Sequence, residues 1–90
     1  MSTAKEDLEQ RILDAGYEEV MLLDNYSYES AFVGITTDNR AVYDYDLMVE
    51  WLVETQGFTR TDAIEWIDYN TLRALPYMGS EAPIIINRIE

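Results

Sequence analysis

Apolar residues near the start of the chain predict one short helix. Leu8 and Ile12 lie one helical turn apart among charged and polar residues, so they form a narrow apolar stripe. Ser2 or Thr3 is a suitable N-cap, and Gly16 is typical of the position just beyond a helix end. Because the stripe is thin, we expect this helix at the edge of the core.

Three short apolar runs then predict strands at residues 18–24, 31–36 and 41–44. The turn residues between the second and third runs predict a hairpin, and Gly34 predicts either a bulge or a close packing contact inside the second. Residues 25–30 combine turn formers with aromatic residues, so we expect a loop that crosses the surface.

The helical spacing of apolar residues returns after the third strand. Asp44 or Asp46 can cap a helix that ends at Gly57. Thr59 can cap a following helix, which Pro76 ends. The predicted inward positions of the first of these helices are Leu47, Met48, Trp51, Leu52 and Thr55.

An apolar run at residues 83–87 predicts a last strand. The predicted order is therefore α-β-β-β-α-α-β, in a single domain over residues 1–90. This order predicts the α+β class, with helices packed on one face of a small, mostly antiparallel sheet. The order of strands within the sheet is left open.

The charge of the chain is extreme for its size. Its 90 residues carry 18 acidic and 6 basic side chains, a formal net charge of −12, while 48% of the residues are hydrophobic. Such a field disfavours nucleic acid and anionic lipid as direct ligands and favours basic partners. No apolar run is long enough for a signal peptide or a membrane span, so a cytoplasmic protein is predicted.

The amino-acid composition argues against a catalytic or metal-binding site. Cysteine and histidine are absent, which excludes disulfides and thiolate metal sites and removes the commonest acid–base catalyst. Asp44 and Asp46 resemble the start of a calcium loop, but its glycine and closing glutamate are missing. A carboxylate pair could serve a glycosidase, and such pairs are inevitable in this composition. We expect no enzyme, no metal and no cofactor.

The placement of the acidic residues is the strongest functional signal. Asp46, Glu50 and Glu54 recur every four residues, which places them in a row along one helix face at about 6 Å per step. No lysine or arginine lies between Arg40 and Arg60. The row, extended by Asp44, is predicted to bind a basic partner; the alternative is a solvated helix face.

Tyrosines and a polar cluster provide two further candidates. Tyr26 and Tyr28, in the predicted surface loop, are the expected rim contacts with a partner, because tyrosine buries area at low entropic cost. Tyr43 and Tyr69 are expected at the rim of the core. A structural hydrogen-bond network, with a ligand site as the alternative, is predicted for Asp68, Asn70 and Arg73.

Three stretches of the chain resemble known proteins: residues 38–44 (DNRAVYD), 65–77 (EWIDYNTLRALPY) and 82–85 (APII). They resemble short acidic proteins encoded by phages and mobile elements of gut bacteria, over about residues 28–86. The resemblance assigns no catalytic or binding residue. It implies a setting in which small acidic proteins disable host defence, as anti-CRISPR proteins do when they occupy the nucleic-acid groove of a Cas effector.

Two functional hypotheses follow. The first is an acidic inhibitor of a basic nucleic-acid-handling host protein, most concretely an anti-CRISPR protein that blocks a Cas effector by nucleic-acid mimicry. The second is a non-enzymatic interaction module, self-associating in one form, whose charge serves only solubility. A small-ligand or metal-dependent enzyme is a third, and it requires a defined pocket.

Overall fold

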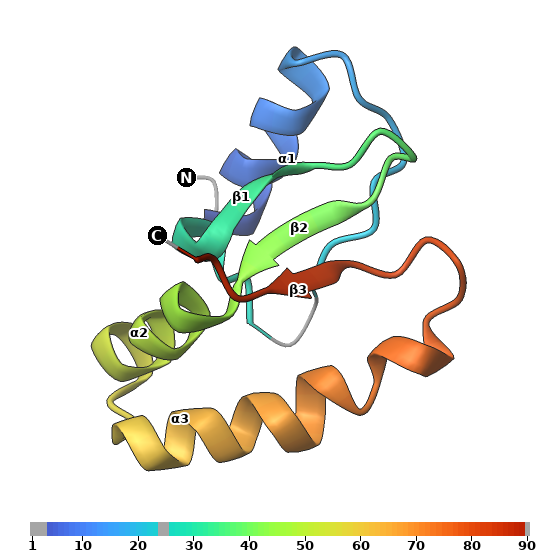
Figure 1. Ribbon diagram of the computed structural model, residues 1–90. Coiled ribbons are helices and arrows are strands. Elements are labelled where there is room, and N and C mark those ends of the chain that lie inside the picture. The colour runs from blue at the N-terminus through green and yellow to red at the C-terminus, as the bar shows by residue number, and fades with distance from the viewer. Residues whose placement is uncertain (1–3, 24–25, 90) are drawn as a thin grey trace.

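The computed structural model describes residues 4–23 and 26–89. It has the predicted α+β architecture with a three-stranded sheet (Figure 1). One helix precedes the first strand in the sequence, and two helices lie between the second and third strands. The predicted caps Ser2 and Thr3 lie outside the described residues. The elements, in chain order, are α1 (Ala4–Asp14), the 3-10 turn η1 (Glu29–Ala31), β1 (Phe32–Ile35), β2 (Ala41–Asp44), α2 (Tyr45–Gln56), α3 (Arg60–Trp66), the π-helical turn η2 (Ile67–Leu72), the 3-10 turn η3 (Leu75–Tyr77) and β3 (Ile84–Ile86).

The hairpin of β1 and β2 forms as predicted. The two strands are antiparallel, and the register shifts between Phe32 and Gly34, which confirms the expected bulge. Asn39 takes the left-handed conformation in the turn (φ 69°), a conformation that asparagine tolerates better than most residues. The chain closes the hairpin with a hydrogen bond from Thr36 N to Arg40 O of 2.8 Å.

The C-terminal strand β3 joins the sheet beside β2, in parallel, so the strand order is β1-β2-β3. A parallel neighbour requires a crossover connection, and α2, α3 and the following turns provide it. The central strand β2 therefore has hydrogen-bonded neighbours on both sides, and β3 has one free edge.

The strand predicted at residues 18–24 is wrong for the residues that are described. Residues 18–23 form an irregular segment without ladder pairing, and Asp24 lies outside the described residues. Leu23 is buried, and its N–H donates to the hydroxyl of Tyr43 at 3.3 Å. Glu19 has a positive φ of 56°, which interrupts extended backbone. The apolar run covers the core with its side chains while its backbone stays outside the sheet.

The starts of α2 and α3 and the end of α2 follow the predicted caps, whereas α3 ends at Trp66 and η2 at Leu72, before the predicted stop at Pro76. The side chain of Asp44 accepts from Leu47 N at 3.0 Å, and Gly57 ends α2 with φ 72°. Thr59 caps α3 by accepting from Asp62 N at 3.1 Å. After Trp66 the helix widens into the π-helical turn η2.

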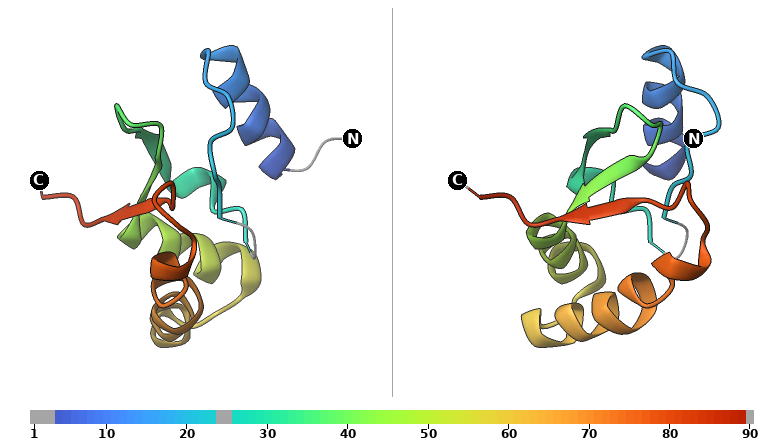
Figure 2. Two further views of the ribbon diagram at one scale, coloured as in Figure 1. Left: turned by 90° about the vertical axis from the view of Figure 1, so that its right-hand side faces the viewer. Right: turned by 45° about the vertical axis from the view of Figure 1, so that its right-hand side comes forward.

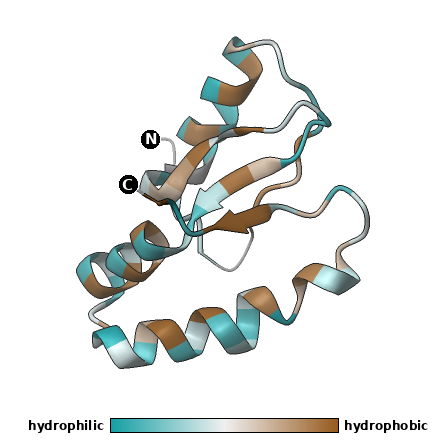
Figure 3. Ribbon diagram, in the orientation of Figure 1, coloured by the Kyte–Doolittle hydropathy of each residue, from teal (hydrophilic) through white to brown (hydrophobic). Residues whose placement is uncertain are grey.

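The core lies where the sheet, α2 and α3 meet. Figures 1 and 2 show α2 and α3 together at one end of the sheet and α1 at the other, while the face of the sheet turned to the viewer in Figure 1 carries no helix. Figure 3 shows alternating hydrophilic and hydrophobic bands on α2 and α3 and a uniformly hydrophobic β3. The buried cluster comprises Leu23, Tyr28, Ala31, Ala41, Tyr43, Met48, Val49, Trp51, Leu52, Ala63 and Ile67.

Candidate functional site

The acidic row of α2 is exposed as predicted. Asp46, Glu50 and Glu54 all lie on the solvent side of the helix, opposite the buried residues Met48 and Leu52. A second set of exposed acids continues along α3 and η2, and its members are Asp62, Glu65 and Asp68. Helices α2 and α3 lie side by side (Figures 1 and 2), and we name the exposed acids of the two helices and η2 together the α2–α3 acidic surface.

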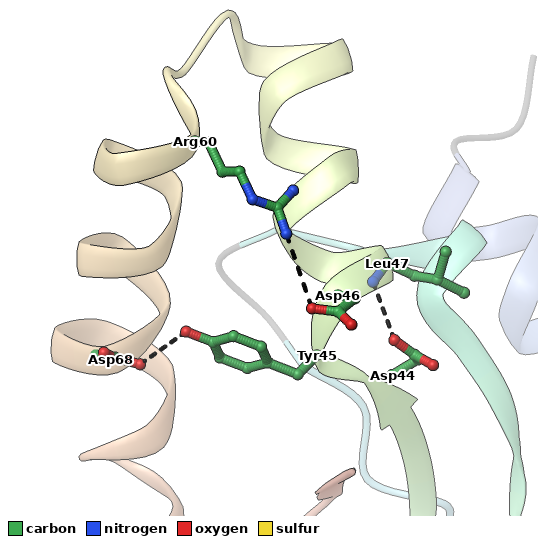
Figure 4. A network of polar contacts seen from close by, with 6 residues as sticks. All are labelled: Asp44, Tyr45, Asp46, Leu47, Arg60 and Asp68. Atoms are coloured by element: carbon green, nitrogen blue, oxygen red, sulfur yellow. Dashed lines mark hydrogen bonds and ion pairs between the residues drawn. The ribbon is translucent and has the colours of Figure 1, made fainter. Parts of the chain in front are cut away.

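Two polar contacts join the helices within this surface (Figure 4). A guanidinium nitrogen of Arg60 lies 3.9 Å from Asp46 Oδ1, and both side chains are largely exposed. The hydroxyl of Tyr45 donates to Asp68 Oδ1 at 3.1 Å, and burial together with the adjacent Asp68 carboxylate raises the pKa of Tyr45. An exposed ion pair of this length contributes about 0–1 kcal/mol. Arg60 therefore adds little stability, and it offsets one of the six acidic charges of this surface.

Asp44 does not belong to the exposed row, and its predicted role as a partner contact is wrong for this conformation. Its side chain is 6% exposed, because it caps α2 and accepts from Arg88 Nε at 2.6 Å. Burial alone would raise the pKa of Asp44, but the Leu47 N–H and the Arg88 guanidinium outweigh it and lower that pKa. The carboxylate ties the start of α2 to the segment after β3.

We expect Asp44→Ala to lower the free energy of unfolding by about 2 kcal/mol, because it removes both the helix cap and the charge-assisted hydrogen bond from Arg88. Asp44→Asn keeps a capping oxygen, so we expect about half that loss. Urea unfolding followed by tryptophan fluorescence measures both. Equal losses in the two variants would contradict the capping role.

Tyr28 is also buried, so the prediction of an exposed rim contact is wrong for this residue. It is 1% exposed, and its ring centroid lies 5.1 Å from that of Trp51. Tyr26 is half-buried, with its ring centroid 5.6 Å from Trp51 and 5.5 Å from Trp66. Together with Phe58 these rings form an aromatic cluster under the loop. The composition of the loop could not predict this aromatic cluster, because the two tryptophans come from α2 and α3.

The aromatic cluster contains three buried polar atoms without a hydrogen bond to any described residue: the Tyr28 hydroxyl, Trp51 Nε1 and Trp66 Nε1. The Tyr28 hydroxyl faces Thr71 and Trp66, and burial raises the pKa of Tyr28. Sequence reasoning missed this group entirely, since neither residue spacing nor composition brings Tyr28 to the π-helical turn.

The residues of the predicted polar network do not converge. Asp68 accepts from Tyr45, Asn70 Nδ2 donates to Trp66 O at 3.1 Å, and the Arg73 guanidinium lies 4.5 Å from the centre of the Tyr69 ring. The Asp68 contact joins η2 to α2, whereas the contacts of Asn70 and Arg73 stay within their own helical segment. The three residues therefore do not form the expected shared network. Tyr69 is exposed rather than at the core rim, whereas Tyr43 is fully buried.

The described part of the chain contains no gathering of three or more carboxylates able to hold a metal ion. Two hollows stand out on the apolar surface, one of about 480 Å³ beside β3 and one of about 300 Å³ between α1 and β1. No helix among the described residues is long and apolar enough to cross a membrane. Six of the 18 acidic residues lie on α2, α3 and η2, and all six are exposed.

Comparisons of this chain with known protein families, with curated proteins and with solved structures found no match.

Proposed function

We propose that this protein is an acidic inhibitor that binds a basic nucleic-acid-handling protein inside a bacterial host cell. Its most concrete form is an anti-CRISPR protein that occupies the nucleic-acid groove of a Cas effector. The contacts would come from Asp46, Glu50 and Glu54, with Tyr26 at the border. Asp44 and Tyr28 support the fold beneath them.

The observation that carries this proposal is the exposed row of three carboxylates one helical turn apart on α2, with Asp46 the only member that has a described ion pair. Like charges at this spacing cost the helix a few tenths of a kcal/mol per pair, about 0.2–0.5. Because the row of carboxylates lowers the stability of the helix, its presence supports a role for these charges in binding.

Spacing supports nucleic-acid mimicry. Carboxylates three or four residues apart on a helix are separated by about 4.5–6 Å along its axis. Phosphates of one duplex strand are spaced about 3.4 Å apart along the helix axis. Two adjacent acidic helices therefore approach the linear charge density of a nucleic-acid backbone. A basic groove shaped for phosphates would meet a comparable field.

The test begins with capture from host lysate on immobilised protein, identification of the captured protein, and measurement of its dissociation constant at low and high salt. We expect the triple variant Asp46→Asn, Glu50→Gln, Glu54→Gln to weaken binding at least about ten-fold, because long-range attraction and contacts are lost together. The matched control removes three exposed acids elsewhere, Glu9→Gln, Glu18→Gln and Glu81→Gln. It should change binding by about two-fold or less.

Competition by DNA or RNA for the captured protein would distinguish mimicry from other binding. Equal loss in the two triple variants would show that only the total charge matters. Binding that survives high salt and resists nucleic-acid competition would contradict the proposal.

One observation favours the interaction module as a second candidate. Four apolar side chains alternate along the strands with residues that pack in or against the core, which places them on the opposite, helix-free face: Val33, which is 40% exposed, and the half-buried Val42, Ile84 and Ile86. The free edge of β3 adjoins this face. Sedimentation at rising protein concentration tests self-association there, which would persist at high salt because apolar contact is not screened.

A further inference from the structure

A groove between α1 and β1 combines an apolar lining with one cation. Its volume is about 300 Å³, and the residues that matter for its chemistry are Arg11, Ile12, Tyr17, Phe32, Gly34 and Ile35. Ile12 and Arg11 come from α1, whereas Phe32, Gly34 and Ile35 come from β1. The groove lies at the end of the sheet opposite to the α2–α3 acidic surface (Figures 1 and 2).

Arg11 differs from the other described arginines. Arg40 donates to Ala82 O at 2.8 Å, Arg60 and Arg88 pair with carboxylates, and Arg73 lies over the Tyr69 ring. The side chain of Arg11 has no hydrogen bond, ion pair or ring contact with any described residue.

An unpaired cation is unexpected in a chain with 18 acidic and 6 basic residues. The nearby acid Asp14 accepts from Gln10 Nε2 at 2.9 Å instead. Arg11 thus has no described ion pair, and it is one of the residues that line the apolar groove.

We propose that this groove binds a small amphipathic carboxylate, with a short apolar tail along Ile12, Phe32 and Ile35 and a carboxylate head on Arg11. A planar guanidinium pairs with a carboxylate through two parallel hydrogen bonds. The groove volume lies at the low end for small-molecule sites, about 300–1,000 Å³. A single head group suits this site, because the net charge of −12 repels a polyanion.

The test is a titration of the whole protein with octanoate below its micellar concentration, followed by backbone amide shifts in NMR. We expect saturable shifts at Ile12, Gly34 and Ile35. Arg11→Met should weaken octanoate binding about ten-fold or more. The wild type should bind octanol, which keeps the apolar tail and lacks the charge, at least about ten-fold more weakly than octanoate. Arg73→Met is the matched control for loss of an exposed arginine and should bind as the wild type does.

Unchanged amide dispersion in each variant shows that the fold is intact. The proposal is overturned if octanoate gives no saturable shift, if its shifts centre on the hollow beside β3, or if Arg11→Met binds as tightly as the wild type. An equal effect of Arg73→Met would also overturn it, because total charge rather than Arg11 would then govern binding.

Discussion

Replacing Tyr28 by alanine is expected to lower the free energy of unfolding by about 3–5 kcal/mol, the range for truncating a buried aromatic side chain. The ring is 1% exposed and makes an edge-to-face contact with Tyr26 and a tilted contact with Trp51. A domain of this size loses about 4–8 °C of melting temperature per kcal/mol. The variant should therefore melt tens of degrees below the wild type.

The backbone of Tyr28 is strained, although its ring is buried in the core. Tyr28 has φ 46° and ψ 36°, a left-handed conformation that costs a non-glycine residue about 1–2 kcal/mol. Burial of the ring outweighs that strain. Alanine keeps the strain and loses the burial, which is why a large effect is expected.

Tyr28→Phe separates the ring from its hydroxyl. Because the hydroxyl is buried without a hydrogen bond to a described residue, we expect the phenylalanine variant to be within about 1 kcal/mol of the wild type, or more stable. Tyr77→Ala is the control, since Tyr77 is 90% exposed and should matter by less than about 0.5 kcal/mol. Urea unfolding measures all three. A loss below about 1 kcal/mol in Tyr28→Ala would place this ring outside the core and restore it as a candidate contact.

Alkaline pH is expected to unfold this protein through Tyr43. Burial raises the pKa of Tyr43 to about 12 from the ordinary value of 10.0. The hydrogen bond that the hydroxyl accepts from Leu23 N–H lowers this pKa, but by less than burial raises it. The folded state thus holds the phenolic proton more tightly than the unfolded state. The resulting stability is fully present below pH 10 and is lost as the pH rises from 10 towards 12.

Two units of pKa correspond to about 3 kcal/mol of stability lost across this window. Burial also raises the pKa of Tyr28, which acts in the same direction. Urea midpoints measured at steps of pH, beside the absorbance of tyrosinate, test the prediction. Tyr43→Phe is the control. It should be about 1 kcal/mol less stable at neutral pH, because the Leu23 N–H loses its acceptor, and should lose less stability in alkali. An equally steep alkaline loss in Tyr43→Phe would contradict the assignment.

Local patterns in the sequence predicted most of the regular elements. Asp44, Gly57 and Thr59 bound the helices as expected, and Gly34 marks the bulge of the hairpin. Each of these signals acts through neighbours a few residues away, so it needs no knowledge of the rest of the fold. The exposure of Asp46, Glu50 and Glu54 followed from helical spacing for the same reason.

The candidate site was predicted only in part, because burial is decided by distant segments. Tyr28 looks like a loop residue among its neighbours, and it is buried because Trp51 and Trp66 arrive from helices far along the chain. Asp44 looks exposed in the same way, until Arg88 covers it from the segment after β3.

By itself, then, the sequence determined the class of the fold, the ends of α2, the hairpin and the strongly negative charge. Tertiary structure alone decided which apolar run would join the sheet. Residues 18–23 and the run of β3 are both apolar enough to form a strand, but only Ile84–Ile86 pairs with β2. One edge of β2 is taken by β1, so a single edge remained, and strand pairing depends on which backbone reaches that edge rather than on hydrophobicity.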